Sequence, residues 1–236
     1  MVLILALAAW LAAGLFQMFS EIMALFPTPD DTLAWSLLFS QLCLLLLFFA
    51  AFAYDRGWGK ILPVLFPRKS TALAAGGAVL GLLAAMIPLK TLELINRVVY
   101  LAVEKIQTVP LQPPVELFLK TGSVRILVML AIMAVVLAPV LEEFLFRGVL
   151  YTGLKKHLGT VPSLALVSLL FALIHPHPFL TILPLFALGV VLIMIYEWSG
   201  SLLAPIVMHA CFNGTFFIIA LSLRQYPDVL WKIVNP

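Results

Sequence analysis

Two adjacent carboxylates and a guanidinium lie within a long apolar stretch of this sequence. Residues 138–150 are Ala-Pro-Val-Leu-Glu-Glu-Phe-Leu-Phe-Arg-Gly-Val-Leu, with the acids at Glu142 and Glu143 and the base at Arg147. An ionisable side chain at membrane depth is costly, and it marks a functional site by default. A carboxylate in such a place can hold a water molecule and take a proton from it, which is the chemistry of a general base.

Helical spacing gives the two carboxylates different surroundings. Glu143 and Arg147 are four residues apart, so they share one face of a helix and can form an i,i+4 ion pair. Glu142 is rotated from Glu143 by about 100° and points away from that partner. The spacing therefore predicts a supporting pair and one separate acid. The alternative is that both acids are helix-end residues at the lipid–water interface, and the polar clusters further along the chain make it less favoured.

Two more polar clusters follow on later apolar segments. His175 is followed directly by a proline, and His209 lies four residues before Asn213 within an apolar segment. Uncompensated polar groups in hydrocarbon cost several kcal/mol each, so the cheapest arrangement brings the clusters together around a hydrated cavity. A carboxylate beside a histidine can deprotonate a water, while a second histidine and an amide can donate hydrogen bonds to the oxyanion of a tetrahedral intermediate. These groups together suit the hydrolysis of a peptide bond.

Composition indicates the class of protein that must position these groups. The 236 residues are 64% hydrophobic and 11% charged, and the mean hydropathy is +1.15. Ordinary soluble domains have far fewer apolar residues, so we predict an all-α integral membrane protein with about seven or eight transmembrane helices. One membrane domain is expected over residues 1–236, with residues 122–222 as the catalytic core. The net charge of +3 is small and scattered, which argues against nucleic-acid binding.

The apolar segments can be followed along the chain. They cover residues 2–26, 33–54, 71–89, 122–139, 161–175, 179–198 and 202–223. Residues 90–107 have an amphipathic pattern, the proline-rich residues 109–115 predict a loop, and Pro139 is expected to kink the helix or to begin a new one. Basic residues in the segment 55–70 and at Lys155 and Lys156 predict that these parts, and the N-terminus, are cytoplasmic. To reach the depth of Glu142, the segment that ends at His175 must be short or tilted.

The three clusters together resemble a known family. The motifs are Glu142-Glu143-x-x-x-Arg147, Phe171-x-x-x-His175 and His209-x-x-x-Asn213, in this order on successive apolar segments. They resemble the CAAX-protease and bacteriocin-processing family, also called CPBP or Abi, of intramembrane endopeptidases, which includes CAAX prenyl endopeptidases. Each motif alone is weakly informative, and the ordered set is specific. The resemblance covers roughly residues 137–214.

The resemblance implies an enzyme, an intramembrane protease, and a role for each residue. Glu142 is implied as the water-activating base with His175 assisting it, His209 and Asn213 as the pair that stabilises the oxyanion, and Glu143 with Arg147 as supporting residues. The implied substrate is a membrane-associated peptide or protein, lipidated ones included, and the implied location is the bilayer, as a multi-pass protein of a prokaryotic plasma membrane. No nucleic-acid partner is expected.

Other mechanisms use the same residues. Glu142, His175 and His209 are acceptable zinc ligands, so a zinc protease is the nearest alternative. We favour no cofactor, because the sequence lacks the His-Glu-x-x-His helix motif of common zinc proteases. Cys211 is two residues from both His209 and Asn213, about 200° around the helix, which predicts a buried structural thiol and not a nucleophile. A non-proteolytic immunity, scaffold or transport protein is the alternative from another functional class.

Overall fold

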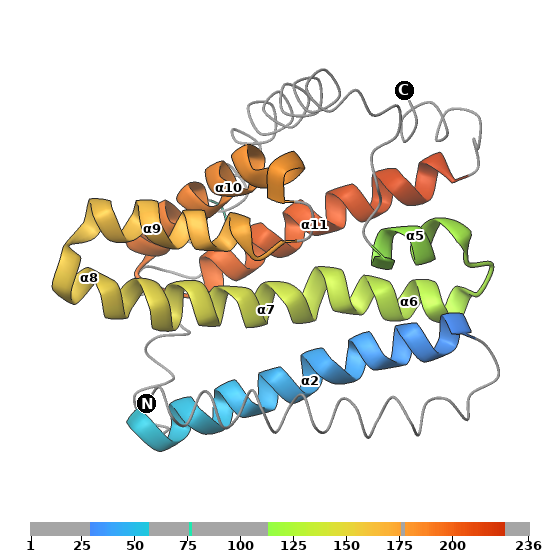
Figure 1. The fold of residues 1–236 in the computed structure, drawn as a ribbon, viewed down its shortest axis with the longest axis horizontal. Helices are drawn as coiled ribbons and strands as arrows, with labels where there is room; N and C mark the ends of the chain where they lie inside the picture. Colours follow the sequence, from blue (N-terminus) through green and yellow to red (C-terminus); the bar gives the residue numbers. More distant parts are fainter. Residues whose placement is uncertain (1–28, 57–75, 77–112, 176–177, 225–236) are drawn as a thin grey trace.

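The computed structural model describes residues 29–56, 76, 113–175 and 178–224, and these ranges consist of helices joined by short turns, without a strand (Figure 1). The expected all-α class is therefore confirmed for this part of the chain. The described helices are α2 (Pro29–Arg56), α5 (Pro113–Lys120), α6 (Val124–Ile132), η1 (Met133–Leu137), α7 (Ala138–Glu143), η2 (Phe144–Tyr151), α8 (Thr152–Leu158), α9 (Thr160–Leu173), α10 (Pro178–Ser199) and α11 (Leu203–Leu223). The predicted segments 2–26 and 71–89 and the amphipathic stretch 90–107 lie outside the described residues, apart from Gly76.

One continuous helical run, from α6 to α8, forms the long axis of the described fold (Figure 1). It spans Val124–Leu158, 35 residues, and begins where the Ser123 side chain accepts a hydrogen bond from the Ile126 N–H. Its η1 and η2 segments are π-helical, with wider turns than an α-helix. The run ends at Gly159, whose φ of +81° is a backbone conformation that favours glycine.

The prediction that a new helix begins at Pro139 is wrong, whereas the alternative of a kink there stays a prediction. The run passes through this proline, which stands at the second position of α7 directly after the π-helical turns of η1. Proline removes only one helical hydrogen bond, and the wider turns before it accommodate the ring. The loop predicted for residues 109–115 is also wrong over its described part, because Pro113 and Pro114 begin α5, where an N–H would lack a helical partner anyway.

Three described helices are long and apolar enough to cross a membrane: Val124–Leu158, Ile182–Ser199 and Leu203–Ser222. This agrees with a membrane protein, and the total of seven or eight spans remains a prediction. The side of the membrane on which Lys155 and Lys156 lie also remains a prediction.

Helix α9 is shorter than a membrane span, which allows His175 at its end to reach the level of Glu142. Its 14 residues extend about 21 Å, against about 30 Å for the hydrocarbon core of a bilayer. It folds back along the long run after Gly159 (Figure 1). Glu142 lies 16 residues before Leu158 (158 − 142), and His175 lies 15 residues after Thr160 (175 − 160). The two side chains consequently reach the same level from opposite chain directions.

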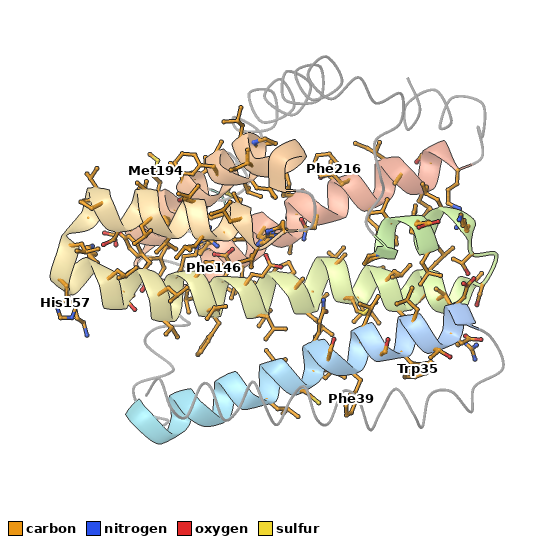
Figure 2. All side chains as sticks on the ribbon, viewed as in Figure 1. Trp35, Phe39, Phe146, His157, Met194 and Phe216 are labelled. Atoms are coloured by element: carbon orange, nitrogen blue, oxygen red, sulfur yellow. The ribbon has the colours of Figure 1, made fainter. Side chains whose placement is uncertain are left out.

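The main apolar core joins η2, α9, α10 and α11. Its buried members are Phe146, Tyr151, Val167, Phe171, Leu188, Leu192, Ile193 and Met208. Phe146 lies between the long run and α9 (Figure 2), where its ring meets the Phe171 ring edge-on at a centroid distance of 5.2 Å. This core places α9 and α10 against the helix that carries Glu142.

The contact between α9 and α10 depends on a glycine. A Cβ added to Gly189 would lie 3.0 Å from both Cα and Cβ of Ser168, which is closer than carbon atoms normally approach. Small residues at such a crossing allow two membrane helices to pack backbone to backbone. The Gly189 carbonyl also accepts a hydrogen bond from Arg147, so the close packing of α9 and α10 also positions the acceptor for this guanidinium.

We expect Gly189→Ala to destabilise the protein, because the added methyl group must push α9 and α10 apart. The expected cost is about 1–3 kcal/mol, typical of overpacking a close contact. Gly153→Ala is the matched control, since a Cβ there meets nothing within 4 Å and alanine favours a helix by up to about 1 kcal/mol. Thermal unfolding of both variants in detergent measures the difference. Equal stability of the two variants would contradict the packing argument.

Candidate active site

A fully buried carboxylate, Glu143, is the centre of the polar site. Its Oε1 accepts a hydrogen bond from Arg147 Nη1 at 2.9 Å, and the side chains of both residues are 0% exposed. The same Oε1 lies 2.9 Å from Nδ1 of His209, which is 4% exposed. The ion pair predicted from the i,i+4 spacing is confirmed. One carboxylate therefore holds groups from the long run and from α11.

Arg147 extends this network to two other helices. Its Nη2 donates to the Gly189 carbonyl of α10 at 3.1 Å, and its Cζ lies 4.9 Å from the centre of the Phe171 ring on α9. A cation over an aromatic face is attracted by the ring, most strongly where water is excluded. The guanidinium thus contacts two other helices and Glu143 on its own run, and Glu143 joins it to His209 of α11.

Glu142 lies between two imidazoles. Its Oε2 is 3.9 Å from Nε2 of His175 and 3.8 Å from Nε2 of His209. The Glu142 side chain is 24% exposed, whereas that of Glu143 is fully buried. The predicted division between one accessible acid and one supporting acid is therefore reflected in their surroundings. The expected meeting of the three polar clusters is observed for these residues.

Hydrogen bonds orient both imidazoles toward Glu142. Nδ1 of His175 is 2.7 Å from the Phe171 carbonyl oxygen, and a carbonyl only accepts, so Nδ1 carries the proton of this bond. Nδ1 of His209 likewise donates to the Glu143 carboxylate. Each ring then turns its Nε2 toward Glu142. Two imidazole nitrogens and a carboxylate consequently converge on one small region.

Asn213 makes a different contact from the one that its predicted role requires. Its Nδ2 donates to the Ala134 carbonyl of η1 at 2.8 Å. An amide has two N–H donors, so one donor remains for another partner. Cys211 packs against the apolar core and is half-buried, in keeping with the predicted structural thiol.

Three backbone and ring contacts of the site were not predicted from the sequence. They are the Gly189 carbonyl, the Ala134 carbonyl and the Phe171 ring face. Phe171 belongs to one of the three motifs, but its position there does not indicate a cation–π contact. The two carbonyls give no sequence signal, because every residue has one and only the packing of helices selects which is used.

The distances between the possible ligand atoms of Glu142, His175 and His209 can be compared with those of a zinc site. Among the residues with described side chains, no group of three or more His, Cys, Asp or Glu residues is arranged to hold a metal ion. Ligand atoms of a tetrahedral zinc lie roughly 3.3 Å apart, because each is about 2.0–2.1 Å from the metal. The separations of 3.8 and 3.9 Å around Glu142 Oε2 are wider than this. Binding of one zinc ion by these atoms would require the side chains to draw closer together.

We expect Arg147→Leu and Glu143→Gln each to cost about 3–5 kcal/mol of stability, because each leaves a buried charge without its partner. The double variant should lose less than the sum of the two losses. Lys155→Met is the control, since the Lys155–Glu197 pair at 2.6 Å is more than a third exposed at both ends and should be worth less than about 1 kcal/mol. Thermal unfolding in detergent tests this, and strict additivity of the two buried changes would argue against the pair.

Comparisons with known proteins match the region that contains these residues. A family model described as "Type II CAAX prenyl endopeptidase Rce1-like" matches residues 124–215. The chain is 33% identical over 103 residues to the membrane-embedded CAAX protease MroQ of Staphylococcus aureus (strain USA300). This match covers 41% of the present chain and 40% of the relative, so the chain spans about two fifths of that curated protein. No solved structure matches.

The family match includes every predicted site residue. Glu142, Glu143 and Arg147 lie in its first third, His175 lies near its middle, and His209 and Asn213 lie at its end. Five of these six residues also converge in space, and Asn213 lies on the same helix as His209 and bonds to Ala134. The resemblance to the CAAX protease family is therefore confirmed over residues 124–215, the part of the chain that contains the whole candidate site.

Proposed function

We propose that this protein is an intramembrane endopeptidase that hydrolyses a peptide bond in a membrane-associated peptide or protein, lipidated substrates included. The match to the Rce1-like family supports this, as does the similarity to a relative that is named a membrane-embedded CAAX protease. Three apolar helices of sufficient length support the membrane location. The prokaryotic plasma membrane and the cytoplasmic N-terminus are part of the proposal.

The observation that carries the proposal is the position of Glu142 between two histidines. Separations of 3.8 and 3.9 Å are too long for direct hydrogen bonds, and Oε2 of Glu142 is itself buried, so a water that bridges these atoms requires the side chains to move apart slightly. No described protein group donates a hydrogen bond to Glu142 Oε2. That oxygen is therefore available as the acceptor for the proton of a nucleophilic water.

The proposed reaction needs no group beyond these side chains and water. Glu142, assisted by His175, takes a proton from the water as the water oxygen bonds to the carbonyl carbon of the substrate, and the carbonyl oxygen becomes an oxyanion. Collapse of this intermediate breaks the C–N bond, and Glu142 returns the proton to the departing amine. Atoms and charge balance over the two steps.

The oxyanion needs hydrogen-bond donors, and two residues of α11 are proposed to provide them. When His209 carries a proton on both ring nitrogens, Nε2–H can donate to the oxyanion while Nδ1 keeps its bond to Glu143. Asn213 can offer the N–H that is not used by the Ala134 carbonyl. Glu143 and Arg147 hold His209 in place and stay away from the substrate.

The proposal predicts that Glu142→Gln abolishes cleavage and leaves the fold intact. An amide cannot accept the proton of the water, and loss of a general base costs about 10²–10⁴-fold in rate. Glu197→Gln is the matched control, because Glu197 pairs with Lys155 on the surface and should keep the wild-type rate. The measurement is cleavage of membrane-anchored and CAAX-type reporter peptides by purified protein. Cleavage by Glu142→Gln at the wild-type rate would refute the assignment of the base.

The same assay distinguishes the alternatives. Cleavage that survives a strong chelator supports water activation by side chains alone. Loss of cleavage on chelation, with recovery on adding zinc, would favour the zinc alternative with Glu142, His175 and His209 as ligands. Failure of the wild-type protein to cleave any reporter would favour the non-proteolytic alternative.

A further inference from the structure

Pro139 leaves one backbone carbonyl of the long run without its helical partner. In η1 the hydrogen bonds connect residues five apart, and the last of them runs from the Ala138 N–H to the Met133 carbonyl. At the same spacing the next N–H, that of residue 139, would bond to the Ala134 carbonyl. Proline has no N–H, so this bond cannot form. The Ala134 carbonyl is consequently open to another donor.

Asn213 is the donor that takes this carbonyl. Its Nδ2 lies 2.8 Å from the Ala134 oxygen, and because a carbonyl only accepts, the contact determines which way the amide is turned. The next residue, Gly214, also faces η1: a Cβ there would be 3.5 Å from Cγ1 of Val135, an ordinary van der Waals distance. In an apolar environment a carbonyl without a partner is costly, so this bond stabilises the contact between the two helices.

The bond determines how α11 is aligned against the catalytic acid. His209 and Asn213 lie on one face of α11, four residues apart, and both bond to the long run. His209 bonds to Glu143, which follows Pro139 by four residues, and Asn213 bonds to Ala134, which precedes Pro139 by five. Two bonds on opposite sides of Pro139 therefore set the register between α11 and Glu142.

We propose that Pro139 is a positioning residue: by lacking an N–H, it leaves the Ala134 carbonyl for Asn213 and so aligns His209 and Asn213 with Glu142. The catalytic consequence rests on the proposed function. The hydrogen-bond competition for the Ala134 carbonyl does not rest on that function, because it depends only on which donors lie near this carbonyl. A proline that only bends the helix would act in the same way whether or not Asn213 is present.

A double-mutant cycle tests the coupling of Pro139 to Asn213. The four proteins are wild type, Pro139→Ala, Asn213→Ala and the double variant, and the first measurement is the apparent Tm in detergent. We expect Asn213→Ala to lower the Tm, because the Ala134 carbonyl loses its partner. Adding Pro139→Ala should restore part of the loss, because the new N–H takes the free carbonyl. If Asn213→Ala yields no folded protein, recovery of folded protein in the double variant is the same rescue.

The second measurement is the kinetics of reporter cleavage. In the otherwise wild-type protein, Pro139→Ala should lower kcat about tenfold or more with KM unchanged, since its new N–H competes with Asn213 and displaces α11. When Pro139→Ala is added to the Asn213→Ala protein, the substitution should lower kcat no further. Pro184→Ala is the control for loss of a helix proline, because Pro184 lies within α10; it should have the same effect in both backgrounds.

Several outcomes would overturn the proposal. Equal Tm shifts from Pro139→Ala in both backgrounds, or no rescue in the double variant, would show that the proline acts independently of Asn213. A coupled Tm cycle with an unchanged kcat for Pro139→Ala would refute the positioning role. If the wild-type protein cleaves no reporter, the proposed function fails, while the Tm cycle still decides whether Pro139 and Asn213 share the carbonyl.

Discussion

The fully buried Glu143 carboxylate is the constraint on which the site depends. A charge at 0% exposure is tolerable only when it is paired, and its Oε1 bonds to both Arg147 and His209. Arg147 in turn bonds to the Gly189 carbonyl and lies over the Phe171 ring. Four helical segments are thus held at fixed positions around one charge. The close approach of α9 and α10 at Gly189 and the short length of α9 are the packing conditions that this network requires.

The network gives the two neighbouring acids different tasks. Oε1 of Glu143 is held by Arg147 and His209, and the whole Glu143 side chain is buried. Glu142, next to it on the helix, is 24% exposed and faces Nε2 of His175 and of His209 at 3.9 and 3.8 Å. The rotation of about 100° between adjacent helical residues is sufficient to give the two carboxylates different partners. The bond from Glu143 to His209 orients one imidazole, and the Phe171 carbonyl orients the other, as the proposed preorganised site requires.

The π-helical turns show how an irregular backbone is tolerated at such depth. A carbonyl without a partner is expensive among apolar side chains, and here a side-chain amide from another helix satisfies it. The helix irregularity and the site are therefore one feature of the structure. The bond between Asn213 and Ala134 connects the irregularity at Pro139 to the helix that also carries His209.

The sequence by itself determined the helical class, the six polar residues and the i,i+4 pair of Glu143 and Arg147. These depend on composition and on helical periodicity, which are local properties. It also required the segment before His175 to be short or tilted. The continuation of the run through Pro139 and the contact of Asn213 with a backbone carbonyl were decided by the tertiary structure. The physical reason is that backbone carbonyls and ring faces are common to many residues, and only the packing of helices distant in sequence selects which of them become partners.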